Sequence, residues 1–337
     1  MRLKRSQFLK FWFWRIATLT AAYIALAQPP QAALPRLKLP EPSRGLSIVG
    51  FEADRTVPAK WERGFLLSYD FDKSIVFAAD RSGKALRAHI SPPEASHVFL
   101  QDVSVSPTGT FAVAFSAISS QGPAGFIAWL DHSGSIGQLV QIASGSAELI
   151  RFADDGSLWA AVRTGAAFGP ESDSYDILRH YDAKGKLIGS ALPRRLFPPG
   201  PFPGELGSLT ASRDRIGFFD RHTRTWVEFD YAGKTLGRWV LPGPRVRYAR
   251  AFLSQSNDVY IGQQESIGKS EIVTTYRFDK SSNALQEFDV SGINSGRPAR
   301  LAGVDGEELV FLVSDHPPLL KWSTQRNSSR SAGATPW

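Results

Sequence analysis

Arginine is concentrated in segments of this chain that are expected to be loops on one side of the folded domain. Its planar guanidinium group binds carboxylate and phosphate groups at two points, so several arginines together favour an anionic ligand or an acidic partner. The candidate residues for this site are Arg245, Arg247, Arg250, Arg297 and Arg300, and Glu148, which enters an inner strand, completes the set. The alternative leaves the arginines solvated or pairs them with acids of neighbouring loops, which contributes little stability.

Residues that could act in catalysis are few and scattered. The six histidines include no pair at the spacing of a helical metal site. The chain also has no cysteine and no Gly-x-Ser-x-Gly nucleophile motif. The pattern therefore gives no catalytic residue, no metal site and no cofactor. A protein that is not an enzyme is the favoured interpretation, and the question of an enzyme stays open.

A recurring turn shows which elements must position the candidate residues. Four segments share the pattern Asp-x-x-Gly, and they begin at Asp80, Asp131, Asp182 and Asp230. A degenerate fifth copy begins at Asp279, and the steps between these aspartates are 51, 51, 48 and 49 residues. Each turn needs glycine for a positive φ angle and joins two strands as a β-hairpin. A period of about 50 residues is typical of a β-propeller.

A second series of turns alternates with the first. Its members begin at Ser106, Ala153, Ser212, Ser256 and Val304, and each is followed by an apolar strand. Two hairpins in each period make four strands, which is one propeller blade. The aspartate turns mark five blades, and a sixth ends at Ser323. The sequence therefore predicts an all-β fold: a six-bladed β-propeller with four antiparallel strands per blade.

The two ends of the propeller must meet, because an open ring would expose strand edges. The segment after residue 323 is polar and unsuited to a last outer strand, so we expect residues 36–39 near the N-terminus to supply it. The predicted boundaries are a signal peptide at 1–27, a proline-rich leader with the closing strand at 28–45, the propeller at 46–323 and a polar C-terminal tail at 324–337.

Two turns of the second series carry a family resemblance. Ser106-Pro-Thr-Gly109 and Ala153-Asp-Asp-Gly156 resemble the Ser-Pro-Asp-Gly turn of TolB-like and related six-bladed propellers. The resemblance covers residues 46–323 and implies the fold alone. Because this short turn occurs in proteins of many functions, it implies no activity for this chain.

Both turn series are expected at one side of the propeller, which leaves the longer connections on the other. Long loops over a rigid scaffold are where binding sites usually lie. The expected long loops are residues 117–125, 164–176, 192–207, 241–250, 263–271 and 290–300. We interpret the proline-rich stretch 193–204 as a surface flap rather than as a lid that frames a pocket with Phe197 and Phe202.

The first 27 residues have the pattern of a secretory signal peptide. Basic residues precede an apolar stretch, residues 16–27, that ends in Ala25-Leu-Ala27 before Gln28. This stretch is short for a helix that spans a membrane. We expect an exported protein, periplasmic or extracellular, with an uncleaved N-terminal anchor as the alternative.

Cleavage changes the charge of the chain. Residues 1–27 hold five of the 39 lysines and arginines and no acidic residue, which leaves 34 basic against 32 acidic residues. The net charge falls from +7 to +2, so a nucleic-acid-binding function loses its support. We expect the mature chain to be a monomer without a membrane span and without nucleic acid as a partner.

These features predict an exported propeller that binds a protein or an anionic small molecule on its long-loop side. The alternative is a propeller hydrolase or lactonase with a divalent metal in the central channel. Gln101 and Glu148 hold equivalent places early in their inner strands. Neutral Gln101, and small or apolar residues in the other blades, argue against a complete set of metal ligands there.

Overall fold

The computed structural model describes most of the propeller. The described residues are 36–39, 42, 44–47, 59–70, 72–92, 95–120, 122–131, 133–143, 145–164, 175–197, 206–243, 248–267, 270–294, 297–313 and 319–324. The predicted signal peptide, the start of the leader and the tail from residue 325 on therefore lie outside the described residues. Within these ranges, no helix combines the length and the apolar character needed to cross a membrane.

The repeated turns form as their residue types dictate. In the first of them the amide of Gly83 donates to the carbonyl of Asp80 at 3.0 Å, and Gly83 has a φ of 81°. The Asp80 carboxylate accepts from the amides of Ser82 and Lys84, at 2.8 and 3.0 Å. Aspartate and glycine together thus close the turn. The same pair of amide-to-carboxylate bonds recurs at Asp131, Asp182 and Asp230.

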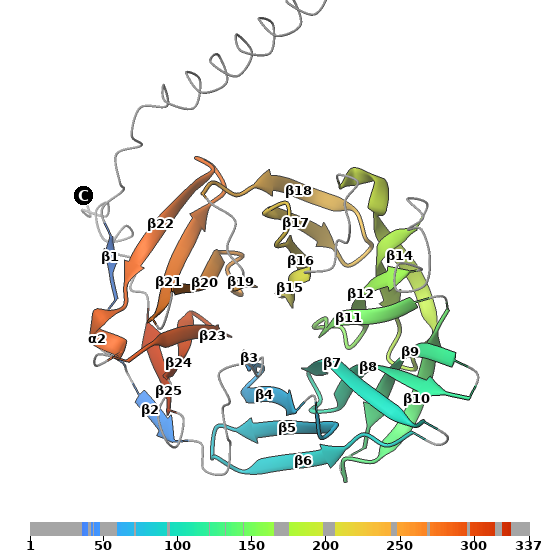
Figure 1. The fold of residues 1–337 in the computed structure, drawn as a ribbon. Coiled ribbons are helices and arrows are strands. Elements are labelled where there is room, and N and C mark those ends of the chain that lie inside the picture. Colours follow the sequence, from blue (N-terminus) through green and yellow to red (C-terminus); the bar gives the residue numbers. More distant parts are fainter. Residues whose placement is uncertain are drawn as a thin grey trace, which may run out of the picture. The chain divides into compact units, whose positions relative to one another are not determined.

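The strands form six sheets in a ring about a central axis (Figure 1). Blade 1 comprises β3 (Lys60–Glu62), β4 (Phe65–Asp70), β5 (Ile75–Asp80) and β6 (Ala85–His89). Blade 2 comprises β7 (His97–Val105), β8 (Phe111–Ser119), β9 (Gly122–Leu130) and β10 (Ile136–Ile142). Blade 3 comprises β11 (Gly145–Phe152), β12 (Leu158–Thr164), β13 (Asp176–Tyr181) and β14 (Leu187–Pro193), and the short 3-10 helix η1 (Arg194–Leu196) follows it.

The other three blades repeat this order. Blade 4 comprises β15 (Leu206–Ala211), β16 (Arg215–Asp220), β17 (Thr225–Asp230) and β18 (Thr235–Val240). Blade 5 comprises β19 (Tyr248–Leu253), β20 (Val259–Ile267), β21 (Ser270–Asp279) and β22 (Ala284–Asp289), with β1 (Leu37–Lys38) as a fifth strand. After the short helix α2 (Ser291–Asn294), blade 6 comprises β23 (Ala299–Asp305), β24 (Glu308–Val313), β25 (Leu319–Thr324) and β2 (Arg44–Ser47). The predicted all-β, six-bladed propeller is confirmed.

An N-terminal strand completes the last blade, but it is not the one that the sequence suggested. Strand β2 pairs antiparallel with β25, with Arg44 opposite Trp322. The expected segment, residues 36–39, instead carries β1, which pairs in parallel with β22 of blade 5. Strand β2 is better suited to closure because Arg44 also reaches Asp305 and Glu308 of blade 6, each at 3.0 Å.

Hydrophobic side chains pack between neighbouring blades. The described residues form six clusters of buried apolar side chains, one at each junction of two blades. At the closing junction Trp61 of blade 1 packs edge-on against Trp322 of blade 6, with 5.1 Å between ring centroids. The clusters include eight buried aromatic side chains of the strands, namely Phe77, Phe115, Trp129, Trp159, Phe218, Phe219, Tyr260 and Phe311.

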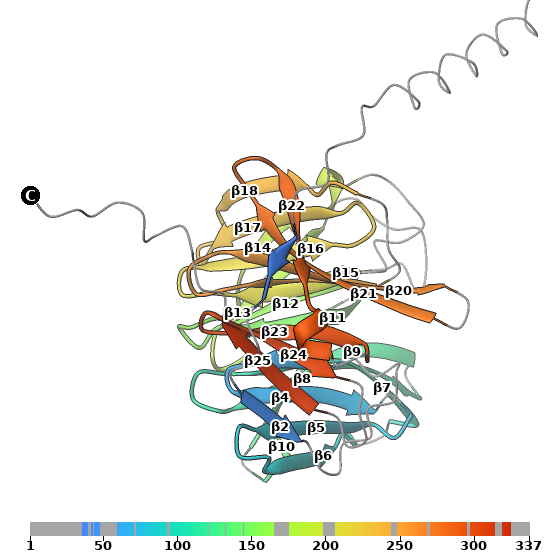
Figure 2. The same ribbon diagram turned by 90° about the vertical axis from the view of Figure 1, so that its left-hand side faces the viewer.

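Both series of turns lie at the same end of the strands, as predicted, but two of the expected long loops are wrong. In blade 2, β8 continues to Ser119 and β9 begins at Gly122. In blade 5, the pairing of β20 with β21 continues to Ile267 and Ser270, and this hairpin projects to one side of the ring in Figure 2. Each of these segments contains one β-branched residue, Ile118 or Ile267, a residue type that favours strand.

The junction of blade 6 with blade 1 has no room for a side chain at Gly303, and this generates a stability prediction. A Cβ atom there would lie 2.5 Å from the carbonyl oxygen of Trp61. Because the obstacle is backbone, we expect Gly303→Ala to lower the free energy of unfolding by roughly 1–3 kcal/mol. Gly292→Ala is the matched control, since a Cβ there meets nothing within 4 Å. Urea denaturation of both variants tests this, and equal losses would contradict it.

Candidate functional site

The six inner strands, β3, β7, β11, β15, β19 and β23, line the central axis (Figure 1). Bonds between neighbours show that β7 and β11 run in the same direction. The Asp102 carboxylate accepts from the amide of Ile150 at 2.9 Å, and the Ser104 hydroxyl accepts from the amide of Phe152 at 3.0 Å. Both bonds span 48 residues, which requires parallel strands in constant register. We call the end at which the inner strands begin the loop end, and the opposite end the turn end.

Hydrogen bonds from backbone amides to side-chain oxygens of the neighbouring inner strand also join blade 4 to blade 5. On β15 the hydroxyls of Ser208 and Thr210 accept from the amides of Ala251 and Leu253 on β19, at 2.8 and 3.3 Å. An inner strand is the edge of its sheet, so some of its amides have no partner strand. Polar side chains of the neighbouring blade satisfy these buried amides, which would otherwise cost stability. These side chains therefore serve the ring and not a ligand.

Four charged side chains meet on the inner strands of blades 1 to 3. Glu62 is fully buried, and its carboxylate lies 2.5 Å from Nη1 of Arg151. This ion pair reaches from blade 1 past blade 2 to blade 3. Lys60 Nζ lies 2.8 Å from the Asp102 carboxylate and 3.6 Å from that of Glu62. Burial lowers the pKa of Arg151, and the charge of Glu62 opposes that shift. Two cations and two carboxylates thus balance each other.

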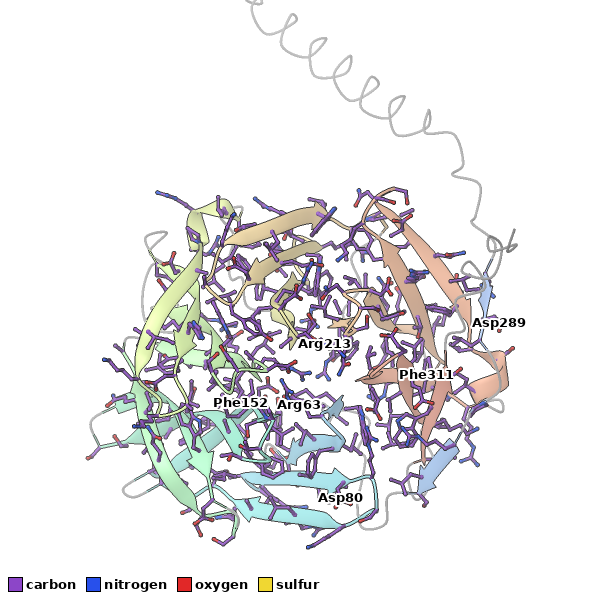
Figure 3. The ribbon with its side chains drawn as sticks, turned by 180° about the vertical axis from the view of Figure 1, so that it is seen from behind. Arg63, Asp80, Phe152, Arg213, Asp289 and Phe311 are labelled. Atoms are coloured by element: carbon purple, nitrogen blue, oxygen red, sulfur yellow. The ribbon has the colours of Figure 1, made fainter. Side chains whose placement is uncertain are left out.

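The turn end is tied together in a similar way. Arg63, in the turn after β3, pairs with Asp154 at 2.5 Å and donates to the carbonyl of Phe152 at 3.3 Å. The Tyr231 hydroxyl accepts from the Asp154 amide at 3.1 Å and donates to the carbonyl of Ser212. Seen from this side, Arg63 lies near the centre of the ring (Figure 3). These contacts join blades 1, 3 and 4 and are structural.

A β-bulge interrupts four of the inner strands at equivalent places. The pairing of β7 with β8 shifts between Leu100 and Asp102, and that of β11 with β12 shifts between Ala147 and Leu149. Four residues at these bulges have no opposite residue on the neighbouring strand, namely Gln101, Glu148, Gly207 and Ala302. Bulges are common next to functional sites because they redirect a side chain. Glu148 is the ionisable member of this set.

Glu148 is held in surroundings that favour its neutral form. Its side chain is 14% exposed and forms an ion pair with Arg163 on β12. Burial raises the pKa of Glu148 to about 7, although the charge of Arg163 opposes the shift. A carboxyl group with this pKa exchanges its proton near neutral pH, so it is able to act as a general acid or base.

The described arginines of the candidate site lie at the loop end. Arg250 on β19 is half-buried, and its Nη1 donates to the carbonyl of Ala59 at 3.1 Å, next to β3 of blade 1. Arg300 is the second residue of β23, the inner strand after β19, and Arg297 is exposed just before it. Arg245 and Arg247 lie outside the described residues. That all five form one patch therefore stays a prediction.

Sequence reasoning missed the residues that surround Arg250. Tyr69 on β4 has its pKa raised, chiefly by burial and also by the charge of Asp102, while Arg250 opposes the rise. Asp102 and Arg250 therefore both lie within electrostatic reach of Tyr69, and Asp102 is paired with Lys60. The signal in the sequence is a charged residue within an apolar strand, as in Phe99-Leu-Gln-Asp102-Val.

The proline-rich stretch places Phe197 in the core. Phe197 is 5% exposed and packs edge-on against Phe218 of blade 4, with 6.2 Å between ring centroids. Arg194 is buried as well, and its Nη1 donates to the carbonyl of Phe197 at 3.2 Å. Phe202 lies outside the described residues. The described part of this stretch thus fastens blade 3 to blade 4, as the flap interpretation expects.

Among the described residues, no group of three or more histidines, cysteines or acids is placed to hold a metal ion.

No family model matches the chain, and no curated protein matches it. A predicted exported protein of Bacteroides fragilis has a similar structure, with a TM-score of 0.55, 10% identity, and coverage of 86% of this chain and 99% of that one.

Two enzymes with solved structures are also similar. Virginiamycin B lyase of Staphylococcus aureus has a TM-score of 0.46 and 12% identity, with 84% of this chain and 99% of that one covered. A gluconolactonase of Xanthomonas campestris has a TM-score of 0.49 and 12% identity, with 88% and 99% covered. With TM-scores below 0.5, neither similarity supports an inference about the activity of this chain.

The pKa of Glu148 gives a prediction with a defined sign. Because the folded pKa, about 7, exceeds the ordinary value of 4.5, protonated Glu148 favours the folded state, and this contribution is lost as pH rises from about 4.5 to about 7. Relative to wild type, Glu148→Gln should therefore gain stability over that range and stay level above it. Urea denaturation at several pH values measures the difference, and a constant difference would show that Glu148 titrates elsewhere.

Proposed function

We propose that this protein is an exported binding module that holds an anionic ligand, or an acidic partner, at the loop end of its propeller. The observation that carries the proposal is the state of Arg250. Its guanidinium group donates a hydrogen bond to the neutral carbonyl of Ala59, and none of the described carboxylates forms an ion pair with it. A fixed, half-buried guanidinium of this kind suits a carboxylate or phosphate group.

The surrounding charges support the same sign of ligand. Lys60 already neutralises Asp102, and Glu148 is only partly ionised at neutral pH. Arg300 is the second residue of the inner strand next to that of Arg250, which adds a second arginine near the start of an inner strand. Deeper along the axis, the charges of Glu62 and Arg151 satisfy each other. The loop end is therefore where an added negative charge is stabilised.

Charge reversal at this end tests the proposal. We expect a polyglutamate peptide to bind the wild-type chain, and to bind less tightly as salt is added because the attraction is electrostatic. Arg250→Glu with Arg300→Glu should weaken binding at least tenfold. Isothermal titration calorimetry measures both effects.

A matched control separates this site from net charge. Lys184→Glu with Lys234→Glu reverses two exposed charges in turns at the opposite end of the strands, and the net charge changes equally. This control should bind the peptide nearly as wild type does. If both double variants lose the same affinity, the attraction belongs to the whole surface and the proposed site is wrong.

Export is the second part of the proposal and has its own test. The pattern of residues 1–27 supports it, and the TolB-like resemblance of the turns is compatible with it. Mass spectrometry of protein produced in a bacterial host with its natural N-terminus should give a mature chain that begins at Gln28. A membrane-bound product that keeps residues 1–27 would replace the signal peptide with an anchor.

One observation favours an enzyme instead. The pKa of Glu148, about 7, suits a general acid or base in a propeller hydrolase or lactonase. Such a mechanism with a divalent metal requires ligands beyond the described residues. Elemental analysis that finds one divalent ion per chain would support this alternative, and then Glu148→Gln should abolish lactone hydrolysis.

A further inference from the structure

The outer edge of blade 5 carries a strand that the propeller does not need. Each blade is complete with four strands, and blade 5 has β1 as a fifth. Leu37 pairs in parallel with Phe288 of β22, and Lys38 pairs with Asp289. Figures 1 and 2 both show β1 beside β22, and Figure 3 places Asp289 at this rim. A segment of the leader thus extends a finished sheet.

The site under this segment has a definite chemistry. Leu39 is 8% exposed and lies in the hydrophobic cluster between blades 5 and 6, with Phe288 and Ile293. Leu37 packs against the same cluster. Arg36 forms an ion pair with Glu287 at 3.1 Å. The site therefore accepts an extended segment in which a basic residue is followed by one leucine at the next position and by a second leucine three positions after the basic residue.

The hold on this segment is weak compared with that on β2. The ladder of β1 is two residues long and parallel, and parallel pairing is slightly weaker per residue. Arg36 is 67% exposed in its ion pair. By contrast, β2 pairs over four residues, and Arg44 stacks over Trp322 at 4.4 Å besides its two ion pairs. The first segment can therefore leave while the second keeps the ring closed.

We propose that the outer edge of β22 is a peptide-binding site, occupied in cis by residues 36–39 and open in trans to an extended segment of another protein. That segment carries the pattern basic residue–Leu–x–Leu. Main-chain bonds to the sheet edge give it affinity, and the pockets for alternate side chains select it. Glu287 selects the basic residue, and Phe288 and Ile293 receive the second leucine. This inference does not depend on the ligand of the loop end.

The test releases the leader and supplies its sequence as a separate molecule. The probe is a fluorescent peptide of residues 34–41, Leu-Pro-Arg-Leu-Lys-Leu-Pro-Glu. In the full mature chain, Arg36→Glu with Leu37→Asp should detach β1 and leave β2 in place. Fluorescence anisotropy should show at least tenfold tighter binding of the peptide to this variant than to wild type, because in wild type the site is filled.

Two controls test whether the peptide binds at the outer edge of β22. Lys84→Glu with Leu187→Asp makes changes of equal charge at exposed positions of blades 1 and 3, and should bind the peptide no better than wild type does. Adding Glu287→Arg to the released variant should abolish binding of the natural peptide and restore it for a peptide with Glu in place of arginine. Equal binding by all variants, or a failed charge exchange, overturns the proposal.

A second measurement tests the proposal if the released variant does not fold. Its melting temperature is compared first with that of wild type. If it does not fold, a photo-crosslinking form of the peptide is added in excess to the wild-type chain. In this form the reactive group replaces Leu37. Crosslinks within residues 284–289 support the site, and crosslinks elsewhere or none at all overturn it.

Discussion

The antiparallel pairing of β2 with β25 closes the ring, and the six blade junctions depend on that closure. A blade buries both of its faces only when it has a neighbour on each side, so blades 1 and 6 must meet. Asp305 of blade 6 joins the parts there, because it pairs with Arg44 of β2 and Arg81 of blade 1 and accepts from Nε1 of Trp322 at 3.1 Å. These contacts hold β2, blade 6 and blade 1 together where the ring closes.

Ring closure brings six sheet edges together along the axis. Some backbone amides on these edges have no partner strand and need another hydrogen-bond acceptor. Hydroxyl and carboxylate groups accept from the amides of the next blade, as Ser104 and Asp102 do. Buried carboxylates in turn need cations, since an unpaired buried charge is costly. Lys60 and Arg151 supply them. Arg250 forms no ion pair with the described carboxylates, which is the reason for proposing a ligand at the loop end and not in the middle of the axis.

The fold was predictable because the turn chemistry is local. An aspartate that binds the amides two and four residues on, with glycine at positive φ, needs no information from other blades. The closing strand was not predictable, since residues 36–39 and 44–47 are both short extended segments of one leader and their partners lie over 240 residues away. The axial charges were missed for the same reason. Glu148 was found by its position, but its raised pKa comes from burial.

The two N-terminal strands have different roles, because β2 closes the ring and β1 only extends blade 5. If β1 detaches, the main loss is the burial of Leu39, worth about 2 kcal/mol, which corresponds to a factor of roughly 30 in an equilibrium constant. A competing segment overcomes such a factor by concentration alone. The ion pairs and stacking of Arg44 are unaffected, because they belong to β2. Exchange at blade 5 therefore leaves the ring, and with it the loop end, in place.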